Sequence, residues 1–173
     1  MNKIISAIFI SLFFSCNSIS IAGHNFINPN NDNFYCKVVA VLDGDTIDCL
    51  ISGNKKIRVR LASIDAPEKN QNFGRVAKKK LSNYVFNKKI IVSIENKDKY
   101  GRYIGELFLN KNSYSINFLM IQNGFAWSYD RYVKDRAYIL ENREAKHLKK
   151  GLWIEKNPIN PEKYRSNKEK KRK

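Results

Sequence analysis

Histidine and cysteine are scarce in this chain of 173 residues, which contains two histidines and three cysteines. His24 lies near the N-terminus and His147 lies in a basic stretch predicted to be helical. Neither histidine lies in a sequence context that would pair it with a cysteine for nucleophilic catalysis. The composition therefore argues against an enzyme that uses a cysteine nucleophile.

Acidic residues are also few. The chain has 16 aspartates and glutamates against 32 lysines and arginines, which gives a net charge of +16 at pH 7. Such an excess of positive charge implies a polyanionic partner, which could be nucleic acid, an anionic membrane or an acidic glycan. The charge alone does not distinguish a binding protein from an enzyme.

A long hydrophobic run is missing as well. The apolar stretch 4–14 follows Lys3 and is shorter than the roughly 20 residues that span a bilayer. Ser20-Ile21-Ala22 follows as a cleavage-site pattern, so we predict that residues 1–22 form a signal peptide. The protein is then exported to the periplasm or the extracellular space, with no stable membrane association. Two alternatives are a retained membrane anchor and lipidation at Cys16.

Two cysteines remain after the predicted signal peptide. Cys36 and Cys49 flank the turn at Asp43-Gly44, where two hairpin strands could bring them close together. Because an exported compartment permits oxidation, we expect a disulfide between them. The alternative is a pair of buried thiols.

Hydrophobic periodicity divides the remaining chain into short elements. The asparagine-rich residues 23–34 are predicted to be a disordered lead-in, and the basic residues 163–173 a disordered tail. One domain over residues 35–162 lies between them, with predicted helices at 75–86, 115–122 and 134–150. The five predicted strands are 37–42, 46–51, 56–61, 88–95 and 102–109.

This order of elements predicts an α+β domain: a five-stranded OB-type β-barrel with three α-helices. An open five-stranded sheet and a different small barrel are the alternatives. Along the third strand, Ile57, Val59 and Leu61 alternate with Lys56, Arg58 and Arg60. A period of two residues places Arg60 on the polar face of that strand.

Two aspartates mark a candidate metal site. Asp45 opens the second strand and Asp65 follows the third. In a flat hairpin we expect these positions at opposite ends, so that barrel coiling must bring them together. If they meet, two carboxylates and a nearby backbone carbonyl form an oxygen-only site that suits Ca²⁺ or Mg²⁺ rather than zinc. Alternatively, Asp43 and Asp45 only stabilise a turn.

Three further side chains could act on a phosphodiester. Glu68 could activate water as a general base or anchor a metal-bound water, unless it is an ordinary surface glutamate. Arg60 and Arg102 could each bind phosphate oxygens through two hydrogen bonds, which lysine cannot do. Two arginines and a cation fit the charge that develops on the equatorial oxygens during phosphoryl transfer.

In order and spacing, the motifs Asp-Gly-Asp-Thr (43–46), Arg-x₄-Asp-x-Pro-Glu (60–68) and Asp-Lys-Tyr-Gly-Arg (98–102) resemble the staphylococcal nuclease family. The likeness continues through Gly-Phe-Ala-Trp (124–127) and Gly-Leu-Trp (151–153), and it covers residues 36–154. The resemblance implies an OB barrel with three helices that hydrolyses DNA and RNA with Ca²⁺.

The resemblance also implies roles for individual residues. Asp45 and Asp65 are expected to be carboxylate ligands of Ca²⁺, with the carbonyl of Ala66 as a backbone ligand. Glu68 is expected to hold or deprotonate the attacking water. Arg60 and Arg102 are expected to bind the scissile phosphate. Four residues are expected to contact substrate: Lys99 and Tyr100 near a terminal phosphate, and Tyr129 or Tyr132 by stacking on a base.

The leading hypothesis is therefore a monomeric, exported, Ca²⁺-dependent nuclease that is indifferent to the sugar and leaves 3′-phosphate ends. The sequence departs from its relatives in a shorter segment after Glu68 and in the spacing of the aromatic stretch 127–132. Two other classes remain open: a noncatalytic OB-type nucleic-acid-binding module, and a cationic surface-binding protein. A binder requires the basic face but not the carboxylates.

Overall fold

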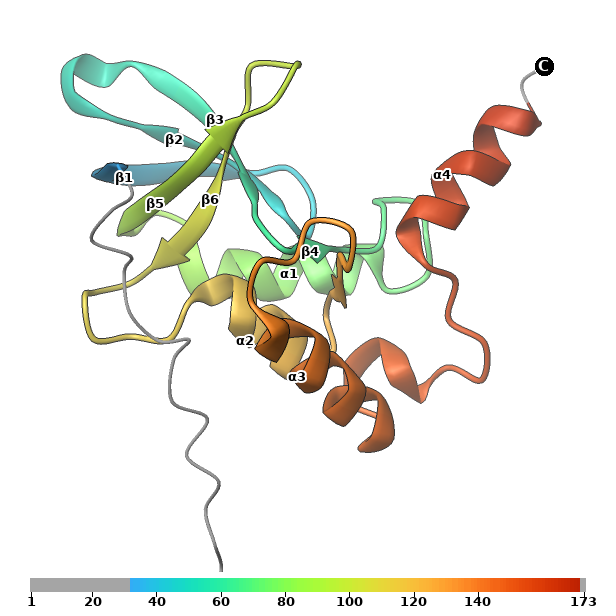
Figure 1. Cartoon of the computed structure of the whole chain (residues 1–173). Helices are drawn as coiled ribbons and strands as arrows, with labels where there is room; N and C mark the ends of the chain where they lie inside the picture. The colour runs from blue at the N-terminus through green and yellow to red at the C-terminus, as the bar shows by residue number, and fades with distance from the viewer. Residues whose placement is uncertain (1–31, 172–173) are drawn as a thin grey trace, which may run out of the picture.

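A computed structural model describes residues 32–171, in which five strands close into a barrel (Figure 1). The predicted leader, Cys16 and most of the predicted lead-in lie outside the described residues. The strand order around the barrel is β1-β2-β3-β6-β5, with β3 and β6 parallel and the other neighbours antiparallel. The barrel strands are β1 (Asp32–Val41), β2 (Thr46–Leu50), β3 (Lys56–Leu61), β5 (Lys89–Lys97) and β6 (Tyr103–Phe108).

The predicted fold class, α+β with a five-stranded OB-type barrel, is confirmed. A separate two-stranded sheet pairs β4 (Ile64–Asp65) with β7 (Trp127–Ser128). Four α-helices accompany the strands in the described residues, one more than predicted. They are α1 (Gly74–Val85), α2 (Ile116–Gln122), α3 (Arg136–His147) and α4 (Pro161–Lys170), with short 3₁₀ helices η1 (Ser52–Asn54) and η2 (Gly151–Ile154).

The fourth helix corrects the prediction of a disordered tail from residue 163. Asn160 caps α4 by accepting hydrogen bonds from the backbone N–H groups of Glu162 and Lys163, and Pro161 occupies the first turn. Both features favour the start of a helix. The high lysine content of residues 163–173 is typical of a disordered segment and outweighs this local signal in the sequence.

The predicted boundary of the lead-in at residue 34 is also corrected. Strand β1 already begins at Asp32, and Asp32, Asn33 and Phe34 pair with residues of β5. Pairing with β5 gives these residues a hydrogen-bonding partner that their own polar composition does not indicate. Across residues 32–171, no helix is both long and apolar enough to cross a membrane.

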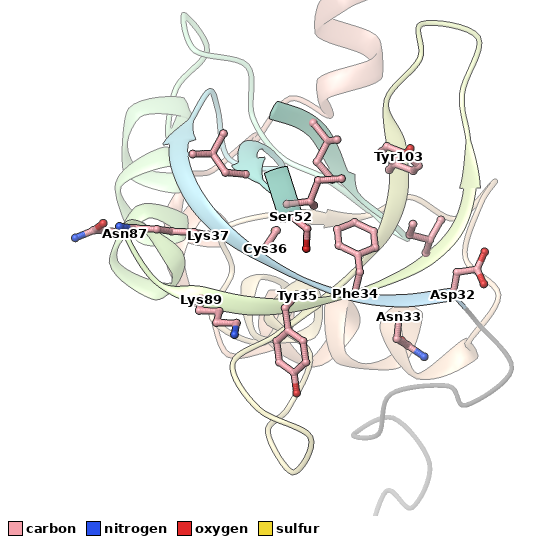
Figure 2. Close-up of a pocket in the computed structure, with 14 residues that line it drawn as sticks. Asp32, Asn33, Phe34, Tyr35, Cys36, Lys37, Ser52, Asn87, Lys89 and Tyr103 are labelled. Atoms are coloured by element: carbon pink, nitrogen blue, oxygen red, sulfur yellow. The ribbon is translucent and has the colours of Figure 1, made fainter. Parts of the chain in front are cut away.

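One mouth of the barrel is hollow (Figure 2). The hollow has a volume of about 950 Å³, and Phe34, Leu50, Ile57 and Tyr103 are among its lining residues. Leu50 pairs with Lys56, whereas Thr46 pairs with Arg60. The hollow therefore lies at the end of the β2–β3 hairpin that is remote from Asp45.

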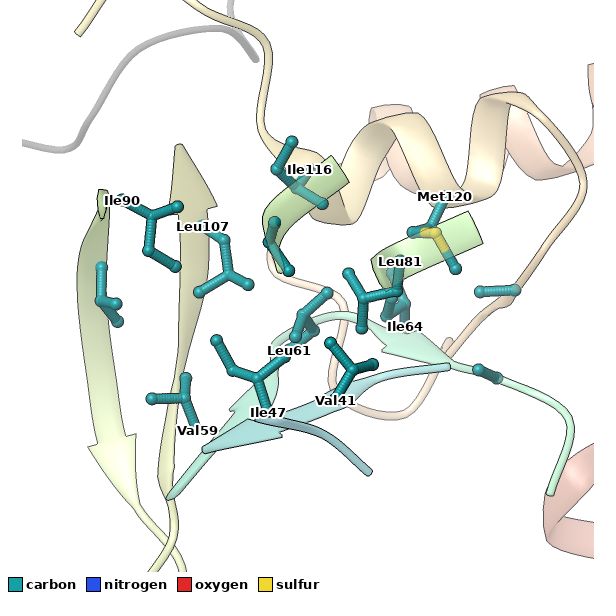
Figure 3. Close-up of a cluster of buried hydrophobic side chains, with 14 of the residues drawn as sticks. Val41, Ile47, Val59, Leu61, Ile64, Leu81, Ile90, Leu107, Ile116 and Met120 are labelled. Atoms are coloured by element: carbon teal, nitrogen blue, oxygen red, sulfur yellow. The ribbon is translucent and has the colours of Figure 1, made fainter. Parts of the chain in front are cut away.

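The core fills the barrel and continues beneath α1 and α2 (Figure 3). Ile57, Val59 and Leu61 are buried, whereas Lys56 and Arg58 are exposed, so the predicted alternation of β3 is confirmed. Leu81 of α1 and Met120 of α2 belong to the same core. Burial of this apolar surface is the main force that holds the helices against the barrel.

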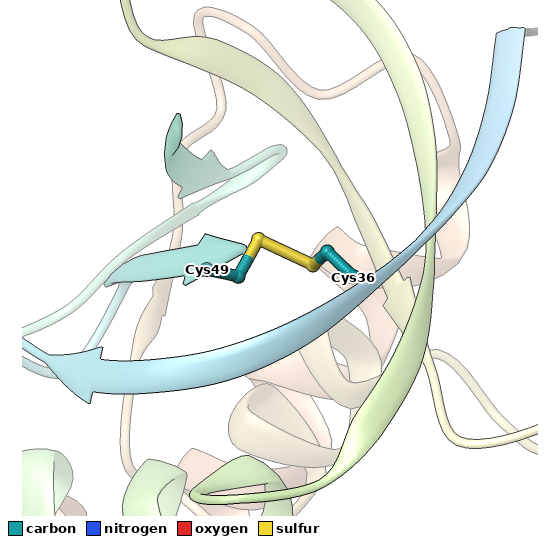
Figure 4. Close-up of a disulfide and its surroundings, with 2 residues drawn as sticks. All are labelled: Cys36 and Cys49. Carbon is teal, nitrogen blue, oxygen red and sulfur yellow. A yellow bond between two sulfur atoms is a disulfide. The ribbon is translucent and has the colours of Figure 1, made fainter. Parts of the chain in front are cut away.

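The expected disulfide joins Cys36 of β1 to Cys49 of β2 inside the barrel (Figure 4). The two Cα atoms lie 5.7 Å apart, within the range that a disulfide requires. The bond connects residues 13 apart in sequence, so it restricts the unfolded chain moderately.

We predict that reduction of the disulfide lowers the free energy of unfolding by about 3 kcal/mol, which is the loop-closure entropy expected for this separation. Urea unfolding with and without dithiothreitol measures the change. The double variant Cys36→Ser/Cys49→Ser is the control, because the reductant should not affect it. An unchanged urea midpoint after complete reduction would contradict the prediction.

A partly buried acid links the barrel to α3. The hydroxyl of Tyr138 donates a hydrogen bond to Glu106 of β6, and Ser115 lies within hydrogen-bonding distance of the same hydroxyl. Burial raises the pKa of Glu106 to about 7, and the charges of Glu95 and Asp135 add to that increase. The hydrogen bond from Tyr138 acts in the opposite direction.

We predict that the free energy of unfolding falls as the pH rises from 4.5 to above 7. Over this range the folded protein retains a proton on Glu106 that the unfolded chain has released. Glu106 alone should contribute a decrease on the order of 3 kcal/mol. Urea unfolding at several pH values measures it. Glu106→Gln should abolish this part of the pH dependence, whereas Glu144→Gln, at an exposed position, should keep it. If the stability of Glu106→Gln depends on pH in the same way as that of the wild type, Glu106 is not the group responsible.

Candidate functional site

The register of β2 and β3 brings the two candidate metal ligands to one edge of the barrel. Thr46 pairs with Arg60, and the carbonyl of Asp45 accepts a hydrogen bond from Leu61 N–H at 2.8 Å. The start of β2 and the end of β3 therefore lie side by side. The expectation that a flat hairpin separates Asp45 from Asp65 was wrong, because antiparallel strands place the start of one beside the end of the other.

The turn before β2 holds Asp45 in place. Asp43 Oδ1 accepts a hydrogen bond from the backbone N–H of Asp45 at 3.0 Å, so Asp43 has the turn-forming role considered as an alternative. Burial raises the pKa of Asp43 to about 7, with a further contribution from the charge of Asp45. A Cβ atom on Gly44 would lie 2.6 Å from Ala66 Cβ and 2.8 Å from Ala77 Cβ. Only glycine permits this close approach of the turn to β4 and α1.

The Asp45 side chain points across to the end of β4. Its Oδ2 atom accepts a hydrogen bond from Ala66 N–H at 2.9 Å, and its Oδ1 atom accepts one from the Thr46 hydroxyl at 2.9 Å. Asp45 therefore does more than form a turn, since it ties β2 to the segment that carries Asp65, Ala66 and Glu68.

Arg60 connects the two aspartates. Its Nη2 atom lies 3.0 Å from Asp65 Oδ1 and 3.5 Å from Asp45 Oδ2. Its Nη1 atom donates to the carbonyls of Leu61 and Ile64, both at 3.0 Å. Burial alone would lower the pKa of Arg60, but the two carboxylates raise it above its ordinary value. The guanidinium is thus a charged, fixed group beside two acids.

A second arginine, which the sequence analysis did not identify, contacts both Asp65 and Glu68. Arg165 of α4 places Nη1 3.1 Å from Asp65 Oδ1 and 2.8 Å from Glu68 Oε1, and its Nη2 lies 2.9 Å from Asp65 Oδ2. Although burial acts to lower the pKa of Arg165, these hydrogen bonds hold it above its ordinary value. Burial raises the pKa of Asp65, and the bonds from Arg165 oppose that increase.

Asn117 is a second residue that the sequence did not single out. It lies on α2 with no exposed surface, and its side-chain amide donates to the carbonyls of Ala62 at 3.0 Å and Gly105 at 3.1 Å. Its Oδ1 atom accepts from Leu107 N–H at 3.2 Å. The sequence feature that could have identified Asn117 is a polar asparagine among the apolar residues of a predicted helix. These bonds fasten the turn between Arg60 and Asp65 to the neighbouring strand.

The structure does not bring Arg102 into contact with the carboxylates of Asp45, Asp65 or Glu68. Arg102 Nε donates to Asp98 Oδ2 at 2.8 Å, within the loop that precedes β6. It comes directly before Tyr103, which pairs with Val59, so the register places Arg102 on the same outer face as Arg58 and Arg60. Arg102 is thus on the correct face but is paired with Asp98.

The predicted substrate-contact residues form two pairs. Lys99 and Arg102 both lie over the ring of Tyr100, which is 73% exposed. Tyr129 lies beside Arg60, whose guanidinium carbon is 5.5 Å from the ring centroid. The Tyr132 ring is 4.8 Å from that of Tyr129 and is more exposed to solvent. Of the two tyrosines, Tyr129 is thus the one in contact with the Arg60 side of the cluster.

The donor set fits a hard cation held by few side chains. In residues 32–171, no group of three or more histidine, cysteine, aspartate or glutamate side chains is arranged to hold a metal ion. The expected set, however, has only two carboxylates, Asp45 and Asp65, and a backbone carbonyl from Ala66. Both carboxylates reach one nitrogen of Arg60, so they lie near enough to serve a common cation.

The chain is similar in sequence to known proteins. A family model described as "Staphylococcal nuclease homologue" matches residues 58–155. An "Uncharacterized endonuclease" of Haemophilus influenzae is 45% identical over 132 residues, which cover 75% of this chain and 72% of the relative. A "Micrococcal nuclease" of Shigella flexneri is 38% identical over 142 residues, covering 77% and 81%. An "Uncharacterized endonuclease" of Escherichia coli O157:H7 is 38% identical over 125 residues, covering 72% and 80%.

We predict that Asn117→Ala lowers the free energy of unfolding by about 3 kcal/mol, because it leaves buried carbonyl and N–H groups without partners. Urea unfolding measures the loss. Asn123→Ala is the matched control, since Asn123 of the same region is only partly buried and should cost less. A loss for Asn117→Ala no larger than that for the control would show that these buried bonds do not fasten the turn.

Proposed function

Because this chain belongs to the staphylococcal nuclease family and is a phosphodiester hydrolase acting on nucleic acid, we propose that it is a Ca²⁺-dependent, sugar-nonspecific endonuclease. The single observation that carries the proposal is the pair of buried carboxylates, Asp45 and Asp65, held beside the partly buried guanidinium of Arg60. A protein that only bound a polyanion would gain nothing from burying acids at its binding face.

Asp45, Asp65 and the carbonyl of Ala66 would hold the ion. When bound, Ca²⁺ would supply positive charge for the phosphate oxygens and for a water ligand. The expected donors are all oxygen atoms, which is the preference of Ca²⁺ and Mg²⁺. We favour Ca²⁺ because of the resemblance of the three motifs to the family.

Glu68 is the candidate base. It follows Asp65 by three residues, and its side chain is 38% exposed, so it can reach both solvent water and the cluster. We propose that it takes the proton of the water that attacks phosphorus in line with the departing 5′-oxygen, which leaves a 3′-phosphate end.

Arg60 would bind a phosphate oxygen. Its Nη1 atom is fixed by two backbone carbonyls, so the guanidinium need not become ordered when substrate binds. Arg102 would add a second contact on the same outer face after exchanging Asp98 for phosphate. Lys99 and Tyr100 would lie near a terminal phosphate, and Tyr129, with Tyr132 beside it, would stack on a base.

DNA and RNA are the proposed substrates, with the protein acting as a monomer. An exported location, periplasmic or extracellular, is part of the same proposal. The Cys36–Cys49 disulfide supports it, because such bonds persist in oxidising compartments. The second candidate, a noncatalytic OB-type nucleic-acid-binding module, has no comparable use for the buried acids.

We expect the protein to cleave single-stranded DNA and RNA with Ca²⁺ and to be inactive with a chelator. Glu68→Gln should lower turnover by about 100-fold or more, the usual contribution of a general base, while DNA binding is kept. Gel-based digestion and fluorescence anisotropy measure the two quantities.

Glu141→Gln on α3 removes the same charge outside the site and should keep normal turnover. Failure of the wild-type protein to cleave with Ca²⁺ would refute the nuclease proposal. Normal turnover of Glu68→Gln would exclude Glu68 as the base.

A further inference from the structure

The C-terminal helix α4 lies against the loop that carries Glu68 (Figure 1). The hydroxyl of Tyr164 donates to the carbonyl of Asn70 at 3.2 Å, and Gln71 donates to the carbonyl of Ile159, which precedes the helix. On the other side, Arg131 contacts Glu162 at 3.0 Å. Arg131 follows Tyr129, so α4 bridges the two segments that border the carboxylate cluster.

Arg165 is the contact between α4 and the cluster itself. Its two terminal nitrogens bind both oxygens of Asp65 and one oxygen of Glu68, at 2.8 to 3.1 Å. The Asp65 side chain is 1% exposed, so its oxygens have little access to solvent. Arg60 and Arg165 together take three of the about four acceptor positions of this carboxylate, so a cation that binds Asp65 competes with Arg165 for it.

We propose that Arg165 is an autoinhibitory latch. In the metal-free protein its guanidinium neutralises Asp65 and Glu68 and holds α4 over the site. The latch opens when a divalent cation binds the carboxylates. This inference rests on the proposed function, because it assigns a regulator to the same Asp65 and Glu68.

The way α4 is attached allows it to leave without unfolding the barrel. Pro161 is its one buried residue, so little apolar surface holds the helix in place. The Arg131–Glu162 pair is largely exposed, with side-chain exposures of 66% and 44%. Exposed ion pairs contribute little to stability. The bonds of Arg165 to the buried Asp65 are thus the strongest polar attachment of α4 to the site.

The composition of α4 favours its release onto substrate. Lys163, Lys168 and Lys170 lie on the same helix as Arg165. A nucleic-acid backbone offers phosphates both to these lysines and to Arg165, which would release the carboxylates of Asp65 and Glu68. Metal and polyanion would therefore both favour the open latch, the first by competing for Asp65 and the second by attracting α4.

Competition between Arg165 and the cation predicts a measurable coupling. If Ca²⁺ binding expels Arg165, removal of Arg165 must strengthen Ca²⁺ binding. Titration calorimetry of the whole protein with CaCl₂, without nucleic acid, measures the affinity. We expect the dissociation constant of Arg165→Gln to be lower than that of the wild type by about tenfold or more, as for loss of a competing charge-assisted contact.

Lys163→Gln is the matched control, since it removes one positive charge from an exposed position of the same helix, two residues from Arg165 and so on a different face. Its Ca²⁺ affinity should stay within about twofold of the wild type, the small effect expected for an exposed charge. An equal gain in both variants would show that general charge, not the Arg165 contact, sets the affinity, and would overturn the latch.

Hydrogen exchange supplies a second measure that does not depend on activity. In the wild type, Ca²⁺ should speed exchange of the amides in residues 161–170, because the helix loses its attachment. In Arg165→Gln these amides should exchange fast with or without Ca²⁺. Exchange in the wild type that does not respond to saturating Ca²⁺ would overturn the proposal.

Cleavage assays then separate the two proposals. At limiting Ca²⁺, Arg165→Gln should cut DNA faster than the wild type, and at saturating Ca²⁺ it should be no slower. Loss of turnover at saturating Ca²⁺ with unchanged Ca²⁺ affinity would make Arg165 a phosphate-binding residue and overturn the latch. A wild-type protein that binds Ca²⁺ and releases α4, yet cuts no nucleic acid, would refute the proposed function and leave the latch standing.

Discussion

Burial of two like charges at one edge of the barrel is the constraint on which the rest of the structure depends. Asp45 and Asp65 are 7% and 1% exposed, and Arg60 contacts both. Buried carboxylates need cations or hydrogen-bond donors nearby, because burial favours their neutral form. The fold supplies those partners from β3 and α4 in the protein without metal.

The same constraint explains why the site is built on fixed elements. Asp45 directly precedes the barrel strand β2, Asp65 ends a short strand that pairs with β7, and Asn117 fastens the turn between Arg60 and Asp65. Gly44 permits the contact between the first turn and Ala66. A site held in this way would need no reordering of its side chains when a phosphate binds. Enzymes gain most from charged groups that are already in place before the reaction.

Positive charge has two opposite uses in this molecule. Spread over the surface it attracts a polyanion, and concentrated in Arg60 and Arg165 it neutralises the acids of the cluster. The net charge of +16 therefore does not describe the electrostatics of the site, where acids and arginines alternate over a few ångströms. The proposed function requires Asp65 to be accessible to a metal ion, and the exposed attachment of α4 is compatible with that requirement.

The sequence by itself determined the five barrel strands, three of the helices, the cysteine pair and the three motifs. Alternation in β3 and helical spacing in α1 depend on neighbouring residues, so they can be read along the chain. Only the tertiary structure decided that α4 docks on the site and that Arg102 pairs with Asp98. Arg165 and Asp65 are 100 residues apart, and no local pattern encodes a contact over that separation. Such a contact exists only because the closed barrel and the chain that follows it bring both residues to the same edge.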